Sequence, residues 1–101
     1  MSRLMAKKAA TAAEQRHMGA VAALGCIVCR NLGHEDTPAH VHHLLSHTMG
    51  KRSPHTSTIP LCAYHHTQGG YGHAIHAGKQ AFEARHGTEV ELLEQVREML
   101  A

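Results

Sequence analysis

Two short stretches, Cys26-Ile27-Val28-Cys29 and Cys62-Ala63-Tyr64-His65, decide the fold of this chain. Each stretch carries two metal-ligating side chains three positions apart, the spacing of a structural zinc half-site. Together they offer three thiolates and one imidazole, a complete tetrahedral set for Zn²⁺. His66 is an alternative fourth ligand, and three buried free cysteines are the competing interpretation. We expect a structural zinc site made of Cys26, Cys29, Cys62 and His65.

The composition favours a fold that a metal ion stabilises. The chain has 101 residues but only one Phe, two Tyr and no Trp, so its hydrophobic core is small. Three cysteines do not pair completely as disulfides, and neither a hydrophobic leader nor a membrane-length apolar run is seen. We expect one domain over residues 1–101, with its core at about 17–97 and a flexible segment at 1–8. A cytoplasmic protein without a membrane segment fits these features.

Hydrophobic periodicity predicts the first half of the fold. A helix is expected at about residues 6–24, ending at Gly25, and a loop at 30–38. Short β-compatible runs at 39–45 and 57–61 are expected to form a pair of strands. The zinc ligands at the start and at the end of this region would hold the helix and the strands together.

Breakers and caps predict a helical second half. A short helix is expected from Cys62, and the glycines at 69–72 end it. A second helix runs to Gly87, with His73 and His76 three positions apart on one face. Thr88 and Glu91 form a capping box that starts the last helix. The predicted fold class is therefore α+β.

The histidines are the strongest anomaly of the composition, with 12 in 101 residues. His42 and His43 lie in an expected strand, where adjacent side chains point to opposite faces. One of them can face a metal while the other faces an attacking water. His66 points away from the zinc site, and His76 and His73 could reach the same pocket. Two or three fixed ligands, open metal positions and a nearby base make a hydrolytic site.

The motifs Val41-His42-His43-Leu44 and Thr58-Ile59-Pro60-Leu61-Cys62, with the helical His66, resemble those of an HNH endonuclease with its ββα-metal finger. More narrowly, the chain is similar to the phage recombination-enhancement, RecA-dependent nucleases. That closer match adds Gly25-Cys26-Ile27-Val28-Cys29 and Ile75-His76-Ala77-Gly78, and it covers roughly residues 15–97. The resemblance implies a small zinc-stapled ββα-metal core with an N-terminal helix and C-terminal helices.

The resemblance also implies a metal-dependent DNA endonuclease that leaves 5′-phosphate and 3′-hydroxyl ends. His43 would be the general base, a role that suits an imidazole because it ordinarily titrates near neutral pH. The catalytic metal would be a divalent cation, either Mg²⁺, Mn²⁺, Ni²⁺ or Zn²⁺. Its ligands would be His42, His66 and His76, and His55 and His73 are further candidate ligands. In the family, the position of His55 usually carries Asp, and its loss favours a softer metal than Mg²⁺.

Charge and resemblance together suggest the partners. Residues 1–82 carry eight Lys and Arg against three acidic residues, whereas residues 83–101 carry two against five. This asymmetry indicates an anionic partner near the histidines, here DNA, and Lys51 and Arg52 between the strands are candidate phosphate contacts. The resemblance adds a recombinase filament as a partner, although the family's long basic N-terminal extension is reduced here to Lys7-Lys8.

Two other functions compete with the nuclease hypothesis. A non-catalytic zinc module that binds nucleic acid or protein would keep the fold without a working site, and His55 is the best support for it. Metal buffering would also use many histidines, but these histidines lie at structured positions instead of in a tract.

Overall fold

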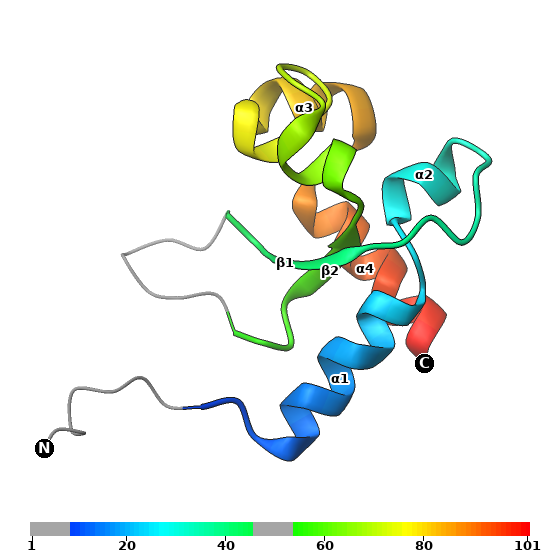
Figure 1. The fold of residues 1–101 in the computed structure, drawn as a ribbon, viewed down its shortest axis with the longest axis vertical. Coiled ribbons are helices and arrows are strands. Elements are labelled where there is room, and N and C mark those ends of the chain that lie inside the picture. The colour runs from blue at the N-terminus through cyan, green and yellow to red at the C-terminus, as the bar shows by residue number, and fades with distance from the viewer. Residues whose placement is uncertain (1–8, 46–53) are drawn as a thin grey trace, which may run out of the picture.

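The computed structural model describes residues 9–45 and 54–101, and these form an α+β fold (Figure 1). The elements in chain order are α1 (Ala12–Ala23), α2 (Ile27–Asn31), β1 (His40–His43), β2 (Thr58–Leu61), the one-turn helix η2 (Tyr64–Gln68), the 3₁₀ turn η3 (Ile75–Ala77), α3 (Lys79–His86) and α4 (Glu89–Leu100). Lys51 and Arg52, the expected phosphate contacts, and the segment 1–8 lie outside the described residues.

The two predicted strands form an antiparallel pair, which is confirmed. His42 lies opposite Ile59 and His43 opposite Thr58. All four residues of β2 are buried, because α1, α2 and α4 pack against this strand. Proline has no backbone N–H to donate to a neighbouring strand. Pro60 is tolerated in β2 because both strands of a two-stranded sheet are edge strands, which have a neighbour on one side only.

Side-chain caps set the ends of the two longest helices. Thr11 and Glu14 form a capping box at the start of α1, so the predicted start at about residue 6 was too early. The predicted end was right, since the backbone of Gly25 turns away with φ of 78°. The predicted capping box of Thr88 and Glu91 is confirmed at the start of α4.

Two local predictions were wrong. Cys29 lies within the short helix α2, with Cys26 as its N-cap, so the expected loop at 30–38 begins later. The single helix expected before Gly87 is divided into η3 and α3. His73 precedes η3, and the extended backbone of Ala74, with φ of −101° and ψ of 129°, separates it from His76. The two histidines therefore do not share a helix face.

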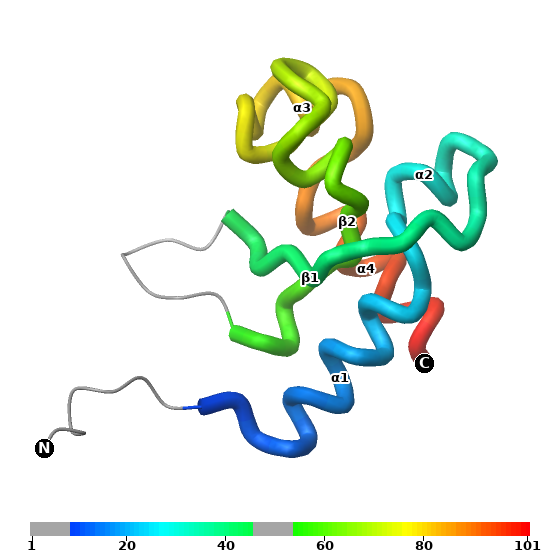
Figure 2. The backbone as a smooth tube through the Cα atoms, in the orientation of Figure 1, coloured from blue at the N-terminus to red at the C-terminus, as the bar shows by residue number. Residues whose placement is uncertain are grey.

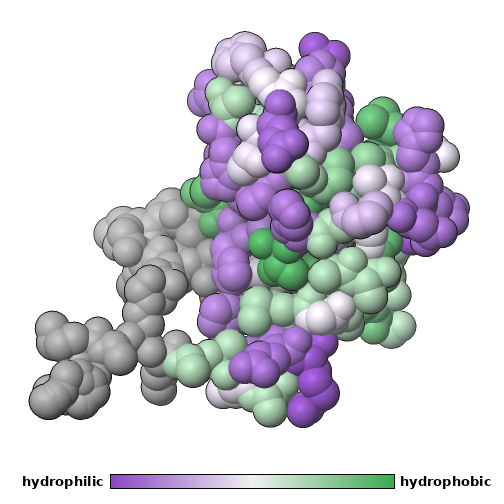
Figure 3. Space-filling view, viewed as in Figure 1, coloured by the Kyte–Doolittle hydropathy of each residue, from purple (hydrophilic) through white to green (hydrophobic). Residues whose placement is uncertain are grey.

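The core fills the space between the sheet and the helices. Figures 1 and 2 show α1 at one end of the molecule, α3 at the other, and α4 passing behind the strands. The only Phe of the chain, Phe82, is fully buried on α3. On the face shown in Figure 3, hydrophilic residues gather around α3 and hydrophobic ones near the middle. Among the described residues, no helix has the length and apolar character needed to cross a membrane.

Candidate metal centres

The three cysteines converge on one imidazole nitrogen. The Nδ1 atom of His65 lies 3.3 Å from Sγ of Cys62 and 3.6 Å from Sγ of both Cys26 and Cys29. The sulfur atoms of Cys29 and Cys62 are 3.8 Å apart. These four residues come from the start of α2, the end of β2 and η2, so three elements meet at the cluster.

These separations match the edges of a zinc tetrahedron. With Zn–S bonds of about 2.3 Å and Zn–N bonds of about 2.0–2.1 Å, tetrahedral edges are about 3.8 Å between sulfurs and about 3.6 Å from sulfur to nitrogen. Cys26, Cys62 and His65 are buried and Cys29 is half-buried. A closed set of four protein ligands is typical of a structural site, which keeps no open position for substrate. The Cys₃His cluster can thus bind a metal such as zinc.

Burial favours the neutral forms of two members of the cluster, Cys26 and His65. Burial raises the pKa of the Cys26 thiol to about 12. Burial, followed by the neighbouring His86 and His73, lowers the pKa of His65 to about 4. A bound Zn²⁺ would supply the positive charge that makes thiolates stable in this position.

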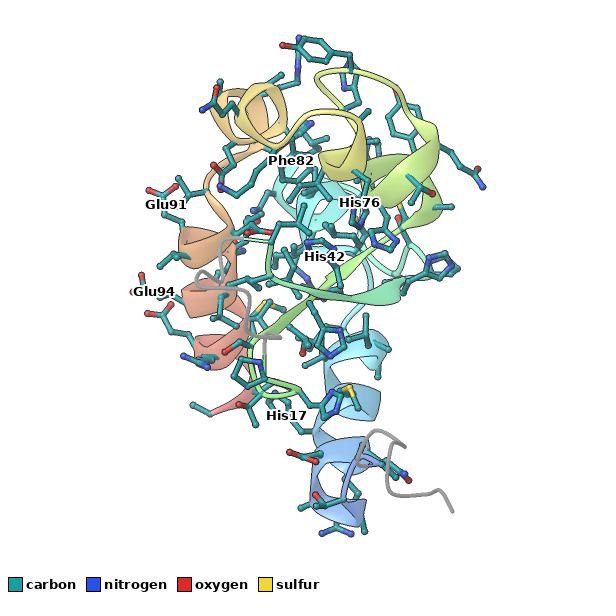
Figure 4. All side chains as sticks on the ribbon, turned by 90° about the vertical axis from the view of Figure 1, so that its left-hand side faces the viewer. His17, His42, His76, Phe82, Glu91 and Glu94 are labelled. Carbon is teal, nitrogen blue, oxygen red and sulfur yellow. The ribbon has the colours of Figure 1, made fainter. Side chains whose placement is uncertain are left out.

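A second group of possible ligands is formed by His42, His66 and His76. One ring nitrogen from each lies within 4.8 Å of those of the other two. The Nε2 atoms of His66 and His76 are 3.1 Å apart. Two imidazole nitrogens bound to one metal ion are expected to be about 3.0 Å apart at an octahedral angle and about 3.4 Å apart at a tetrahedral angle, so the observed distance fits a shared ion. Figure 4 shows His42 and His76 close together in the middle of the molecule, whereas His17 lies far away on α1.

This second site differs from the first in its exposure. His42 is 2% exposed, His66 is half-buried and His76 is exposed, so the cluster opens toward solvent on the η3 side. Burial, followed by the charges of His42, His76 and His40, lowers the pKa of His66 to about 4. Burial also lowers the pKa of His76. Neutral imidazoles are competent metal ligands, and three of them with solvent access leave room for a further ligand.

The one-turn helix η2 directs its two adjacent histidines to different sites. The backbone N–H of Gly69 donates to the carbonyl of Tyr64 over 2.8 Å, which makes a wide π-type turn. His65 faces the thiols, while His66 faces His42 and His76. Of the two possible fourth zinc ligands weighed from the sequence, His65 lies in the Cys₃His cluster and His66 does not.

The other histidines that the sequence offered for the catalytic site are not members of the three-histidine group. Nε2 of His43 is 2.9 Å from Nδ1 of His55, so these two form a pair separate from the three-histidine group. The ring of His73 lies 5.7 Å from that of Tyr64 and 5.9 Å from that of His86. Neither His55 nor His73 belongs to the cluster of His42, His66 and His76.

One acidic residue at this site was missed by the sequence reasoning. Oε2 of Glu89 lies 2.8 Å from Nε2 of His42 and accepts a 2.8 Å hydrogen bond from the backbone N–H of Leu45. Glu89 is the first residue of α4 and is fully buried. In the sequence it stands inside the capping box Thr88 to Glu91, where acidic residues are ordinary, so nothing local distinguishes it.

Comparison with known proteins assigns the chain to a family. A family model described as "Recombination enhancement, RecA-dependent nuclease" matches residues 10–101. A search of curated proteins finds no match. The family match includes every residue of both metal centres.

Proposed function

Because this chain belongs to the family of recombination enhancement, RecA-dependent nucleases, we propose that it is a metal-dependent DNA endonuclease of the HNH type. The two strands followed by η2 have the order of a ββα-metal finger. In this proposal the Cys₃His cluster holds a structural zinc, and the three-histidine group holds the catalytic divalent cation.

The observation that carries the proposal is the divergence of two adjacent histidines on β1. His42 joins His66 and His76 in a possible metal site, whereas His43 is paired with His55. Adjacent residues of a strand point to opposite faces, so ligand and base are close in the chain but do not compete for one position. A separate base and an open ligand set are what hydrolysis of a phosphodiester needs.

His43 is the proposed general base. It takes a proton from the attacking water as the oxygen of that water bonds to phosphorus, and the bond from phosphorus to the 3′ oxygen breaks. A proton from solvent then passes to the leaving 3′ oxygen, and His43 releases its proton to solvent, so the products are a 5′-phosphate and a 3′-hydroxyl. A cation held by His42, His66 and His76 would polarise the phosphate and stabilise the leaving oxygen. The contact with His55 orients the His43 ring.

DNA and a recombinase filament are the proposed partners. The family's description links nuclease activity to RecA, and the uneven charge of the chain favours an anionic partner near the histidines. The described residues offer no long basic helix for reading sequence, so the proposal assigns target choice to the filament and not to base contacts.

A plasmid-nicking assay tests the proposal. Zinc-loaded protein is incubated with supercoiled DNA, with and without a recombinase filament, in Mg²⁺, Mn²⁺ or Ni²⁺. We expect metal-dependent cleavage that His43→Ala lowers by about 10²–10⁴-fold. His34→Ala is the matched control, because His34 is exposed in the loop after α2 and should keep full activity.

The same assay tests the non-catalytic alternative. DNA binding without cleavage in any of the three metals, with or without the filament, would favour a zinc module that has kept the fold and lost the reaction. Equal cleavage by His43→Ala and wild type would remove His43 from the role of base.

A further inference from the structure

The fully buried carboxylate of Glu89 has a role that helix capping does not explain. The side chain of Thr88 already accepts from the backbone N–H of Glu91 at the start of α4, and Glu91 completes the capping box. The carboxylate of Glu89 faces the end of β1 instead, where its Oε2 atom meets His42 and Leu45. Burying a carboxylate is costly unless its partners compensate for the lost water.

We propose that Glu89 is a positioning residue of the three-histidine site, fixing the ring and the tautomer of His42 and thereby raising the affinity of that site for a divalent cation. The inference rests on the proposed function insofar as it takes His42, His66 and His76 as the catalytic metal ligands. Glu89 itself is not part of that ligand set, so it acts through His42.

The hydrogen-bond pattern sets the tautomer. The backbone N–H of Leu45 can only donate, so Oε2 of Glu89 is an acceptor there. The same oxygen lies 2.8 Å from Nε2 of His42, and a carboxylate accepts from an imidazole N–H in this geometry. Nε2 of His42 therefore carries the hydrogen, and Nδ1 carries the lone pair that a metal requires.

The backbone of Glu89 is anchored to the preceding helix, α3. The backbone N–H of Glu89 donates to Oε2 of Glu83 over 2.8 Å, and Oε1 of Glu83 pairs with Nζ of Lys79 at 3.2 Å. The ring of His42 contacts the rings of both His66 and His76, with 5.1 Å between ring centroids in each case. A carboxylate on one side and two imidazoles on the other leave this ring little freedom to turn.

A metal-bound imidazole whose other N–H meets a carboxylate is a better donor to the cation, and such outer partners typically change metal affinity by about 10–100-fold when they are removed. The negative charge of Glu89 also compensates part of the charge of a cation held by three neutral imidazoles. The ligand that this arrangement favours is a divalent transition-metal ion such as Zn²⁺ or Ni²⁺, and Mn²⁺ serves as a paramagnetic probe of the same site.

Mn²⁺ binding to the zinc-loaded protein, measured by electron paramagnetic resonance, tests the inference. We expect Glu89→Ala to weaken Mn²⁺ binding toward the upper end of the about 10–100-fold range, and Glu89→Gln toward the lower end. Gln keeps one acceptor oxygen for the two N–H donors but loses the charge. Glu94→Gln removes the same charge from the exposed face of α4 (Figure 4) and should leave Mn²⁺ affinity unchanged.

A second measurement covers the case in which Glu89→Ala does not fold. Long-range ¹H–¹⁵N NMR of the zinc-loaded wild type should show His42 protonated at Nε2, and Glu89→Gln should show a mixed or shifted tautomer. Unchanged Mn²⁺ affinity in folded Glu89→Gln would overturn the inference, and so would an unchanged His42 tautomer.

The outcome separates this inference from the proposed function. If Mn²⁺ binding depends on Glu89 and His42 but the wild type never cleaves DNA, the proposed function fails and the positioning role stands. If the wild type cleaves DNA and Glu89→Gln binds Mn²⁺ as tightly as the wild type, the positioning role fails and the function stands.

Discussion

Nε2 of His43 lies 2.9 Å from Nδ1 of His55, and the two rings meet edge to face at 5.1 Å between centroids. His43 comes from β1, and His55 from the segment just before β2. The carbonyl of His55 accepts a 3.2 Å hydrogen bond from the hydroxyl of Thr58, the residue that pairs with His43 across the sheet. His55 stands where the family resemblance leads us to expect an aspartate. It therefore contacts the proposed base and not the proposed metal site.

His55→Ala should lower kcat for DNA nicking by about 10–100-fold and change KM much less, because a base that loses its orienting partner is misplaced but DNA binding is not. His55→Asp should keep more activity than His55→Ala, because a carboxylate can also hold the His43 ring. Steady-state nicking of plasmid DNA measures both values. A fall in Mn²⁺ affinity with unchanged kcat would instead make His55 a metal ligand.

Removing the structural metal should unfold the protein. Zinc in a Cys₃His site contributes on the order of 10–16 kcal/mol to small zinc domains, as much as the whole stability of an ordinary domain. We expect Cys62→Ser, or the wild type after chelation, to lose helical circular dichroism and its tightly bound zinc.

His76→Ala is the matched control for that experiment. His76 is exposed and belongs to the other cluster, so the variant should keep one zinc and the wild-type melting temperature while it loses Mn²⁺ binding. A melting temperature of Cys62→Ser equal to that of wild type would show that the Cys₃His cluster does not stabilise the fold.

Acid should destabilise the zinc-loaded protein through His66. The folded state keeps this imidazole neutral down to a pKa of about 4, whereas its ordinary value is 6.5. Between these values the unfolded chain binds more protons, so stability falls as the pH decreases from 6.5 toward 4. Thermal melts across this range, in the absence of a second cation, should show a shallower decline for His66→Gln than for wild type. Parallel declines in the two proteins would contradict the prediction.

Phe82→Ala should lower the free energy of unfolding by about 3–5 kcal/mol, because it deletes a fully buried ring and leaves a cavity. Urea titration of the zinc-loaded protein measures the change. Tyr71→Ala removes a ring that is 79% exposed and should cost far less. Similar losses in the two variants would mean that α3 is not part of the core.

Local features of the sequence were sufficient where one segment sets its own geometry. The spacing of Cys26 and Cys29, and of Cys62 and His65, brings each ligand pair together within a single turn. The capping box of Thr88 and Glu91 is likewise a contact between residues three apart. Alternation along β1 was enough to predict that His42 and His43 have different partners.

Contacts between distant segments were decided by the tertiary structure alone. Glu89 and His42 are 47 residues apart, and only the packing of α4 against the sheet brings the carboxylate to the ring. His73 and His76 were expected to share a face, but the backbone between the glycine turn and η3 sends them to different clusters. Helical spacing describes neighbours within one helix, whereas the composition of a metal site depends on which elements bury their apolar faces against one another.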